Sequence, residues 1–182
     1  MASAVKKATQ TSRLASTTAI ALCIVTLSAC GGSKATPIGA SNVPLGTVPQ
    51  FSFDSLDARP VSSHALRGRV TVITFVTTWD LMSQAQVEFL AVMAKRDGAK
   101  VNYAAVALQR YADRELIEVY RTKLGLPYPF AIAGGADDPS VAPFVPFEAV
   151  PTTIVLDKEG HIAFRKTGLV KSDELRSAMR GL

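Results

Sequence analysis

Residues 69–90, RVTVITFVTTWDLMSQAQVEFL, join two different hydrophobic patterns with almost no loop between them. The run from Val70 to Phe75 is rich in β-branched residues, which is typical of a central strand buried on both faces. Between Gln86 and Lys95 the apolar side chains recur at helical spacing. They are Val87, Leu90, Ala91 and Ala94. The stretch therefore predicts a buried strand that turns directly into an amphipathic helix.

Strands and helices continue to alternate around this junction. The further predicted elements are an edge hairpin within 51–69, a strand over 100–108, a helix from Arg114 to Leu124 closed by Gly125 and Pro127, a short strand within 128–134, a hairpin over 152–168 that turns at 157–160, and a last helix capped by Ser172 with Leu175, Ala178 and Met179 inward. Strands that alternate with helices pair in parallel, and the hairpin adds antiparallel strands. The sequence thus predicts an α/β domain with three layers, α/β/α, around a central mixed sheet.

Composition and charge exclude some classes of function. The 182 residues are 48% hydrophobic, which indicates a globular domain and not a disordered chain. The formal net charge is +5, but Lys6, Lys7 and Arg13 lie in the first 29 residues, where there are no acids. The rest of the chain has a net charge of only +2 and no cluster of bases on one element. A nucleic-acid partner is therefore not expected.

The first 30 residues have the layout of a secretory signal, with basic residues, an apolar stretch from about Leu14 to Leu27, and then small residues. An uncleaved membrane helix is the alternative, but the apolar stretch is shorter than the roughly 20 residues that a span needs. The sequence Leu27-Ser28-Ala29-Cys30 resembles the lipobox of bacterial lipoproteins. That resemblance implies cleavage before Cys30, acylation of its sulfur, and anchoring in a membrane by several acyl chains.

Three parts follow along the chain: a lipoprotein signal peptide over 1–29, the lipidated Cys30 with a flexible tether over 30–49, and a folded domain over 50–182. The tether is rich in Gly, Ser, Ala and Pro and has no apolar period. The expected location is the cell envelope, lipid-anchored on the periplasmic side of a membrane. Gly31 is not the Asp that commonly retains lipoproteins in the inner membrane of Gram-negative bacteria, which favours the outer membrane in such a host.

The two cysteines of the chain, Cys23 and Cys30, both lie near its N-terminus, and no cysteine follows. Cleavage of the leader would remove Cys23, and acylation would consume the sulfur of Cys30. The predicted folded domain therefore has no disulfide, no thiolate nucleophile and no cysteine metal ligand of its own.

Two segments, LDARPVSSHALRGRVTVITFVTTW (56–79) and VPTTIVLDKEGHIAFRKTG (150–168), resemble the thioredoxin-like superfamily. Within it, the chain is similar to the TlpA/ResA-type membrane-anchored thiol-disulfide reductases and their redoxin (AhpC/TSA-like) relatives. The resemblance covers about residues 48–182. It implies a thioredoxin-like fold in which Pro151 is a cis-proline facing the redox pair and Val150 presents its backbone to an extended partner.

The redox residues of that family are missing from this chain. The family motif is Trp-Cys-x-x-Cys, and alignment on Trp79 places its two cysteines at Asp80 and Ser83. In the peroxiredoxin pattern Thr77 matches, but Ile73 stands where a proline is expected. Dithiol exchange and peroxide reduction both proceed through a thiolate, so this chemistry does not carry over to Asp80 and Ser83.

A carboxylate at position 80 has a structural explanation. The exposed N–H groups and the dipole of a helix N-terminus, which stabilise a thiolate in the family, also stabilise a carboxylate. Asp80 is expected to accept a hydrogen bond from the N–H of Met82 or Ser83 as an N-cap. In this interpretation Asp80 and Ser83 are helix-start residues of a degenerate CxxC site, and no residue is a confident catalytic candidate.

A shallow apolar groove is expected beside these positions, and exposed apolar patches of this kind often mark partner contacts. Its predicted lining is Trp79, Met82, Val150 and Pro151. In the loop APFVPF (142–147), the sequence leaves open whether Phe144 and Phe147 extend the rim of this groove or fill the core.

Metal and cofactor sites are not expected. The histidines, His64 and His161, are predicted to lie in exposed loops. A copper site like that of the related copper chaperones needs two thiols besides a histidine, and the domain has none.

Three functions remain open. The first is a lipid-anchored, redox-inactive thioredoxin-like lipoprotein that binds a protein partner or an extended peptide of the cell envelope in the groove. The second is a thiol-disulfide oxidoreductase or peroxiredoxin-type antioxidant protein that acts with a partner's cysteine. The third is a purely structural lipoprotein without a ligand.

Overall fold

In the computed structural model, which describes residues 44–182, the predicted junction consists of strand β3 (Thr71–Val76) and helix α1 (Leu81–Asp97). Every residue of β3 is buried, as expected for a strand covered on both faces. Helix α1 starts earlier than its apolar stripe, directly after Asp80. The predicted buried strand with a helix attached to it is therefore confirmed.

The other elements follow the predicted alternation. They are β1 (Ser52–Ser55), β2 (Val61–Ser62), the 3-10 helix η1 (Gly98–Lys100), β4 (Asn102–Leu108), η2 (Tyr111–Asp113), α2 (Arg114–Leu124), β5 (Phe130–Ala133), η3 (Pro139–Phe144), β6 (Thr152–Leu156), β7 (Ile162–Thr167) and α3 (Ser172–Met179). Helix α2 ends, as predicted, at Gly125, which adopts the left-handed conformation that glycine tolerates best.

The strands form one mixed sheet in the order β2-β1-β5-β4-β3-β6-β7. Strands β3, β4 and β5 are parallel neighbours, and β6 joins β3 antiparallel. Phe75 of β3 is paired with Thr152, the first residue of β6. The carboxyl ends of the three parallel strands and the amino end of β6 therefore lie at the same edge of the sheet.

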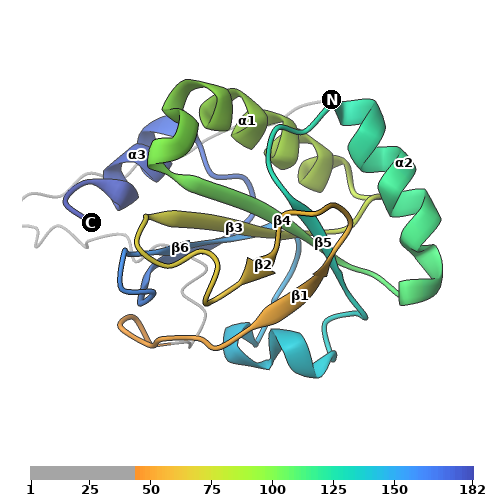
Figure 1. Cartoon of the computed structure of the whole chain (residues 1–182), viewed down its shortest axis with the longest axis horizontal. Helices are drawn as coiled ribbons and strands as arrows, with labels where there is room; N and C mark the ends of the chain where they lie inside the picture. The colour runs from red at the N-terminus through yellow and green to blue at the C-terminus, as the bar shows by residue number, and fades with distance from the viewer. Residues whose placement is uncertain (1–43) are drawn as a thin grey trace, which may run out of the picture. The chain divides into compact units, whose positions relative to one another are not determined.

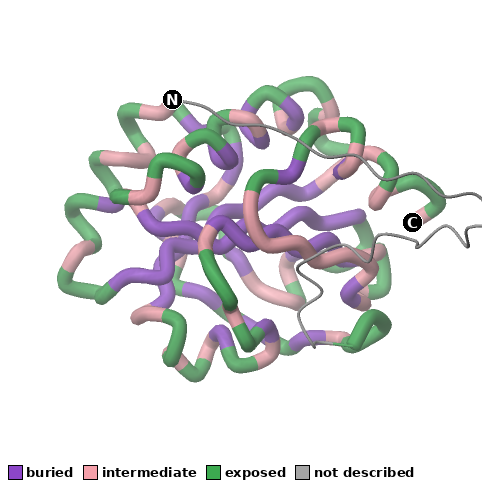
Figure 2. Tube along the Cα trace, turned by 180° about the vertical axis from the view of Figure 1, so that it is seen from behind, coloured by how far each residue is buried: buried purple, intermediate pink, exposed green. Residues whose placement is uncertain are grey.

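Helices α1, α2 and α3 all pack on one face of the sheet. Val87, Ile117 and Leu175, one from each helix, belong to the same buried cluster. In Figure 1 these helices lie above and to the right of the sheet, while the short helix η3 lies below it. The buried parts of the chain gather between these layers, at the centre of Figure 2.

The opposite face is covered by η3 and by the segment around β1. Phe144 of η3 packs with Phe51, Phe53 and Phe75 in a second buried cluster, with ring centroids 5.1 to 6.0 Å apart. The α/β fold with a central mixed sheet is thus confirmed. Its third layer consists of the 3-10 helix η3 and an aromatic cluster, and not of α-helices as the sequence predicts.

One local prediction is wrong. Ser172 is the first residue of α3 and not its cap, because Lys171 occupies the N-cap position without a side-chain hydrogen bond. Residues 46 and 47, near the end of the predicted 30–49 tether, are hydrogen-bonded to the domain. Gly46 N donates to Ile162 O (2.9 Å) and Ile162 N donates to Thr47 O (2.8 Å), which docks this segment on β7.

The predicted signal peptide and lipidated Cys30 lie outside the described residues. Within 44–182, no helix combines the length and the apolar character that crossing a membrane requires.

Candidate functional site

Asp80 links the end of β3 to the start of α1. Its backbone is extended, and its Oδ2 accepts a hydrogen bond from Ser83 N at 2.7 Å. This is the predicted N-cap, with Ser83 and not Met82 as the donor. The carboxylate thus satisfies one of the backbone N–H groups that have no partner within the helix.

Ser83 points inward at the same place. It is completely buried, and its Oγ accepts a hydrogen bond from Thr77 N at 3.3 Å. The two residues that align with the redox cysteines therefore fix the first turn of α1 to the end of β3. Both positions carry oxygen groups that already have hydrogen-bond partners.

Two buried glutamines extend this network to neighbouring elements. Gln109, which follows β4, accepts a hydrogen bond from Thr78 N at 2.6 Å through its Oε1. Gln86 of α1 accepts one from Val170 N at 2.8 Å. Sequence reasoning missed both glutamines. The position of Gln109, directly after a buried strand that ends at the same sheet edge as β3, was the available signal.

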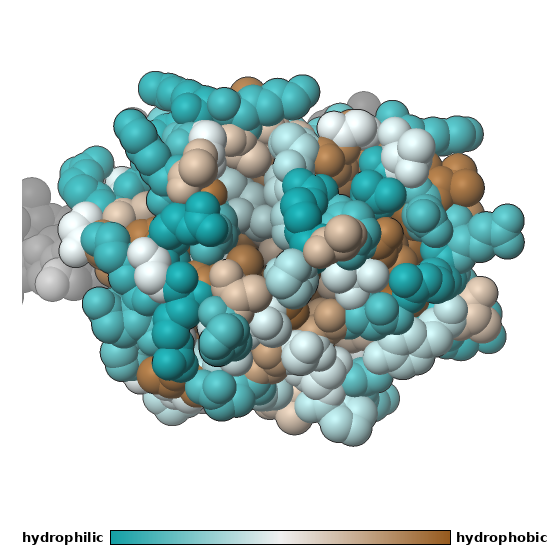
Figure 3. All heavy atoms as spheres, in the orientation of Figure 1, coloured by the Kyte–Doolittle hydropathy of each residue, from teal (hydrophilic) through white to brown (hydrophobic). Residues whose placement is uncertain are grey.

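The segment beside Asp80 leaves three large apolar side chains in solvent. Trp79, Leu81 and Met82 are 69%, 77% and 46% exposed. Asp80 holds the backbone of this segment in place, so its apolar side chains are presented on a fixed support. Elsewhere, on the face of the molecule drawn in Figure 3, hydrophobic residues emerge mostly as separate patches between hydrophilic ones.

Val150 and Pro151 lie at the same sheet edge as Trp79. They immediately precede β6, whose first residue is paired with Phe75 near the end of β3. Val150 is half-buried and Pro151 is buried. The Val150–Pro151 peptide bond is cis, as is Val145–Pro146. The structure therefore places all four predicted groove residues at one edge of the sheet.

The loop before Pro151 is held by β7. The guanidinium group of Arg165 donates hydrogen bonds to the carbonyl oxygens of Phe144 and Pro146, and it lies over the ring of Phe147 at 5.4 Å. Burial lowers the pKa of Arg165, while the charge of Glu148 acts in the opposite direction. Arg165 was not singled out from the sequence.

The role of Phe144 and Phe147, open from the sequence, is decided by packing. Phe144 is fully buried in the aromatic cluster. Phe147 is partly buried and packs against Phe75 with ring centroids 4.7 Å apart. Both rings therefore pack with the core and do not extend the rim of the predicted groove.

No protein-family model and no curated protein matches the chain, but solved structures share its fold. A DsbF homologue from Corynebacterium diphtheriae superposes with a TM-score of 0.68 at 21% identity, covering 85% of this chain and 97% of that one. A secreted thiol-disulfide isomerase from Corynebacterium glutamicum gives 0.65 at 20% identity, covering 78% and 87%. StoA from Bacillus subtilis gives 0.59 at 15% identity, covering 73% and 98%.

The chain has the thioredoxin-like fold. At these identities the likeness establishes the architecture, and the activities in those names belong to those proteins. Within this thioredoxin-like domain no residue after position 30 is a cysteine, so the site described above has no thiol of its own.

A tyrosine lies close to the capped start of α1 in this thioredoxin-like domain. Burial, together with the negative charges of Glu88 and Asp80, raises the pKa of Tyr120 on α2 to about 12. Tyr120 is therefore neutral across the physiological range and cannot supply a phenolate nucleophile to the site.

The histidines lie away from the groove. His64 is exposed, as predicted. His161 is not fully exposed: its Nδ1 lies 3.0 Å from Asp157 Oδ2 in the β6–β7 turn. Together with Glu159, these two residues place three potential metal-ligand atoms within 4.8 Å of one another. Hydrogen bonds within the turn already account for the placement of Asp157 and His161, because Asp157 Oδ1 also accepts from His161 N at 2.8 Å.

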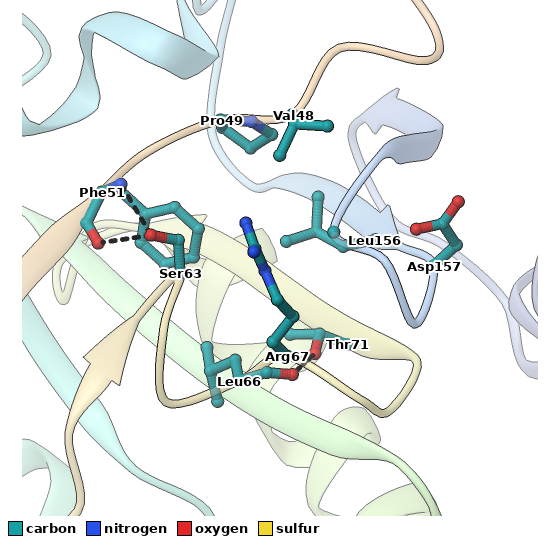
Figure 4. Close-up of a pocket in the computed structure, with 10 residues that line it drawn as sticks. Val48, Pro49, Phe51, Ser63, Leu66, Arg67, Thr71, Leu156 and Asp157 are labelled. Carbon is teal, nitrogen blue, oxygen red and sulfur yellow. Dashed lines mark hydrogen bonds between the residues drawn. The ribbon is translucent and has the colours of Figure 1, made fainter.

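A further cavity lies near this turn, at the edge of the sheet opposite the one that carries Trp79. Figure 4 shows the Arg67 side chain projecting into it between residues of the N-terminal segment and Leu156. Its volume is only about 10 Å³, roughly what a single water needs. It is therefore not a site for a substrate or a cofactor.

Proposed function

We propose that this chain is a membrane-anchored, thioredoxin-like lipoprotein of the redoxin type that performs no thiol exchange of its own. It binds a protein partner or an extended peptide at the groove of Trp79, Met82, Val150 and Pro151. The observation that carries the proposal is the hydrogen bond of 2.7 Å from Ser83 N to Asp80 Oδ2. It gives a helix-capping role to the residue at which the family resemblance implies a reactive thiol.

Binding is supported by the surface that surrounds this cap. Trp79 and Met82 are apolar, solvent-exposed and carried on a segment that hydrogen bonds hold to β3 and β4. A fixed apolar surface loses little conformational entropy when a partner covers it. Aromatic residues such as Trp79 are also enriched among the residues that dominate binding energies.

The location that we propose is the cell envelope, with attachment to a membrane through lipid on Cys30 and, in a Gram-negative host, to the outer membrane. The basic and apolar leader before Cys30 supports export. The secreted thiol-disulfide isomerase among the structural neighbours is consistent with a place outside the cytoplasm.

The anchor is tested by the substitution Cys30→Ser in the full chain. We expect the protein to move from the membrane pellet to the soluble fraction or to remain unprocessed, because the sulfur that takes the lipid is gone. Cys23→Ser is the matched control and should leave membrane sedimentation unchanged. Equal sedimentation of the C30S variant and the natural chain would contradict lipid anchoring at this residue.

Groove binding is tested with peptides selected on the purified chain from a displayed library that lacks tryptophan and cysteine. Trp79 is the only tryptophan of the chain, so its emission reports directly on occupancy of the groove. We expect a saturable change in emission, and Val150→Asp should weaken binding by at least about tenfold. Val92→Asp, at a 69% exposed position of α1, is the control and should leave affinity unchanged.

The same preparation separates the enzymatic alternative. With dithiothreitol present, the chain should reduce insulin no faster than buffer alone, because it lacks a dithiol to transfer electrons. Turnover above buffer, or affinity that is indifferent to V150D, would overturn the proposed function.

A further inference from the structure

A hollow of about 480 Å³ opens beside Trp79, on the side away from Pro151. It lies at the carboxyl ends of β3, β4 and β5, where ligands of open α/β sheets commonly bind. Trp79 and Leu116 of α2 contribute exposed apolar surface to its lining, and Leu108 and Gln109 at the end of β4 contribute buried side chains. Its volume falls in the range of small-ligand pockets.

The β5 side of this hollow is bare backbone. A Cβ atom at Gly134 would lie 2.6 Å from Asp138 Oδ2 and 2.9 Å from the ring of Tyr111, so no side chain fits there. At Gly135 a Cβ atom would meet nothing within 4 Å, which means that the space above it is open. The backbone is thus covered by Asp138 and Tyr111 of this chain at Gly134 and is open to close approach at Gly135.

The hollow also has a buried donor without a partner. Gln109 is only 2% exposed, and its Oε1 is used by Thr78 N. Its Nε2 has no hydrogen-bond partner among residues 44–182. An unpaired buried donor is unfavourable, and because this nitrogen is itself buried, a ligand's carbonyl oxygen can accept from it once the amide turns toward the hollow.

The charges around the hollow do not select an ion. Arg110 on its rim is paired with Asp113 at 3.3 Å, and the adjacent Arg114 is paired with Asp54 at 2.5 Å. Because each base already has an acid beside it, the rim offers no net attraction to a phosphate or a carboxylate. A neutral, apolar group with a carbonyl nearby fits better, and an apolar residue of a polypeptide has both properties.

We infer that this hollow seats one large apolar side chain of the bound polypeptide, between Trp79 and Leu116. The inference rests on the proposed function, and it extends the ligand's path past Trp79 to the ends of β4 and β5. It also assigns a role in ligand specificity to Leu116, whose side chain contacts the ligand directly. The preferred ligand is thus an extended segment with a bulky apolar residue.

The test compares three variants with the natural chain, each titrated with the selected tryptophan-free peptides. Leu116→Asp alters the hollow, Val150→Asp alters the groove, and Val92→Asp places the same change at an exposed site on α1. We expect L116D to weaken binding by at least about tenfold and V92D to have no effect. Replacing the bulky residue of the peptide with alanine should then weaken binding to the natural chain but hardly change binding to L116D. Both changes remove the same contact, so their effects should not add.

The outcomes are distinguishable. Weakening by V150D together with full affinity of L116D would overturn the hollow as a subsite and leave the proposed function standing. Full affinity of both variants, or no saturable change of Trp79 emission with any peptide, would overturn the proposed function and this inference together. Circular dichroism checks that each variant is folded, which is expected of L116D and V92D because Leu116 and Val92 are solvent-exposed. Val150 packs against the second buried cluster, so weaker binding by V150D counts only if its spectrum matches that of the natural chain.

Discussion

The double substitution D80C/S83C should give this chain insulin-reducing activity that the natural chain lacks. Residues three apart at a helix start are neighbours, so the two thiols would lie within reach of one disulfide. Asp80 Oδ2 already accepts the N–H of Ser83 at 2.7 Å, and a thiolate at position 80 would lie in the same field of backbone N–H groups. Such a field lowers the pKa of a thiol and makes it reactive at neutral pH.

Single substitutions control this experiment. D80C alone should form mixed disulfides with insulin without sustained turnover, because no second thiol resolves them. D80A should remain inactive and lower the free energy of unfolding by about 1 kcal/mol, the usual cost of losing an N-cap. A folded D80C/S83C variant with two titratable thiols and no turnover would show that this site lacks more than sulfur.

Phe144→Ala should be among the most destabilising single changes in the domain. The ring is fully buried and lies 5.1 Å from both Phe51 and Phe75, measured between ring centroids. Removal of a buried phenylalanine side chain typically lowers the free energy of unfolding by about 3–5 kcal/mol. The free energy of unfolding of a whole domain is only about 5–15 kcal/mol, so this change should strongly destabilise the layer formed by η3.

Chemical denaturation followed by circular dichroism measures the loss. Met82→Ala is the comparison, because Met82 is 46% exposed and its removal should change the free energy of unfolding by less than about 0.5 kcal/mol. If F144A instead left stability unchanged and weakened peptide binding, Phe144 would belong to the groove and not to the core.

The junction at Trp79 was predictable because its determinants are local. A β-branched run, a helical stripe and an acid before the first turn lie within residues 69–90, and they specify β3, α1 and the Asp80 cap. The degenerate redox positions could be placed for the same reason, since the family motif is short and Trp79 marks its start.

The rest of the site depends on contacts between distant parts of the chain. Gln109 meets Thr78 only because β4 lies beside β3, and the hollow exists only because α2 and β5 arrive at the same edge. Arg165 reaches the loop before Pro151 from another strand. The hydrophobic periodicity of one segment does not reveal its contacts with distant segments. The sequence therefore predicted the groove residues but not the contacts that hold them in place.

The docking of residues 46–47 on Ile162 has a practical consequence. Ile162 begins β7 and is paired with Leu156 at the end of β6, so it lies a full strand length, about 17 Å, from the edge that carries Pro151. The C-terminal residue is near the same far edge, because Lys158 Nζ donates to Leu182 O at 2.7 Å. A purification tag or an immobilising linker at the C-terminus therefore lies at the pole opposite Pro151 and leaves the surface around Trp79 and Pro151 unobstructed.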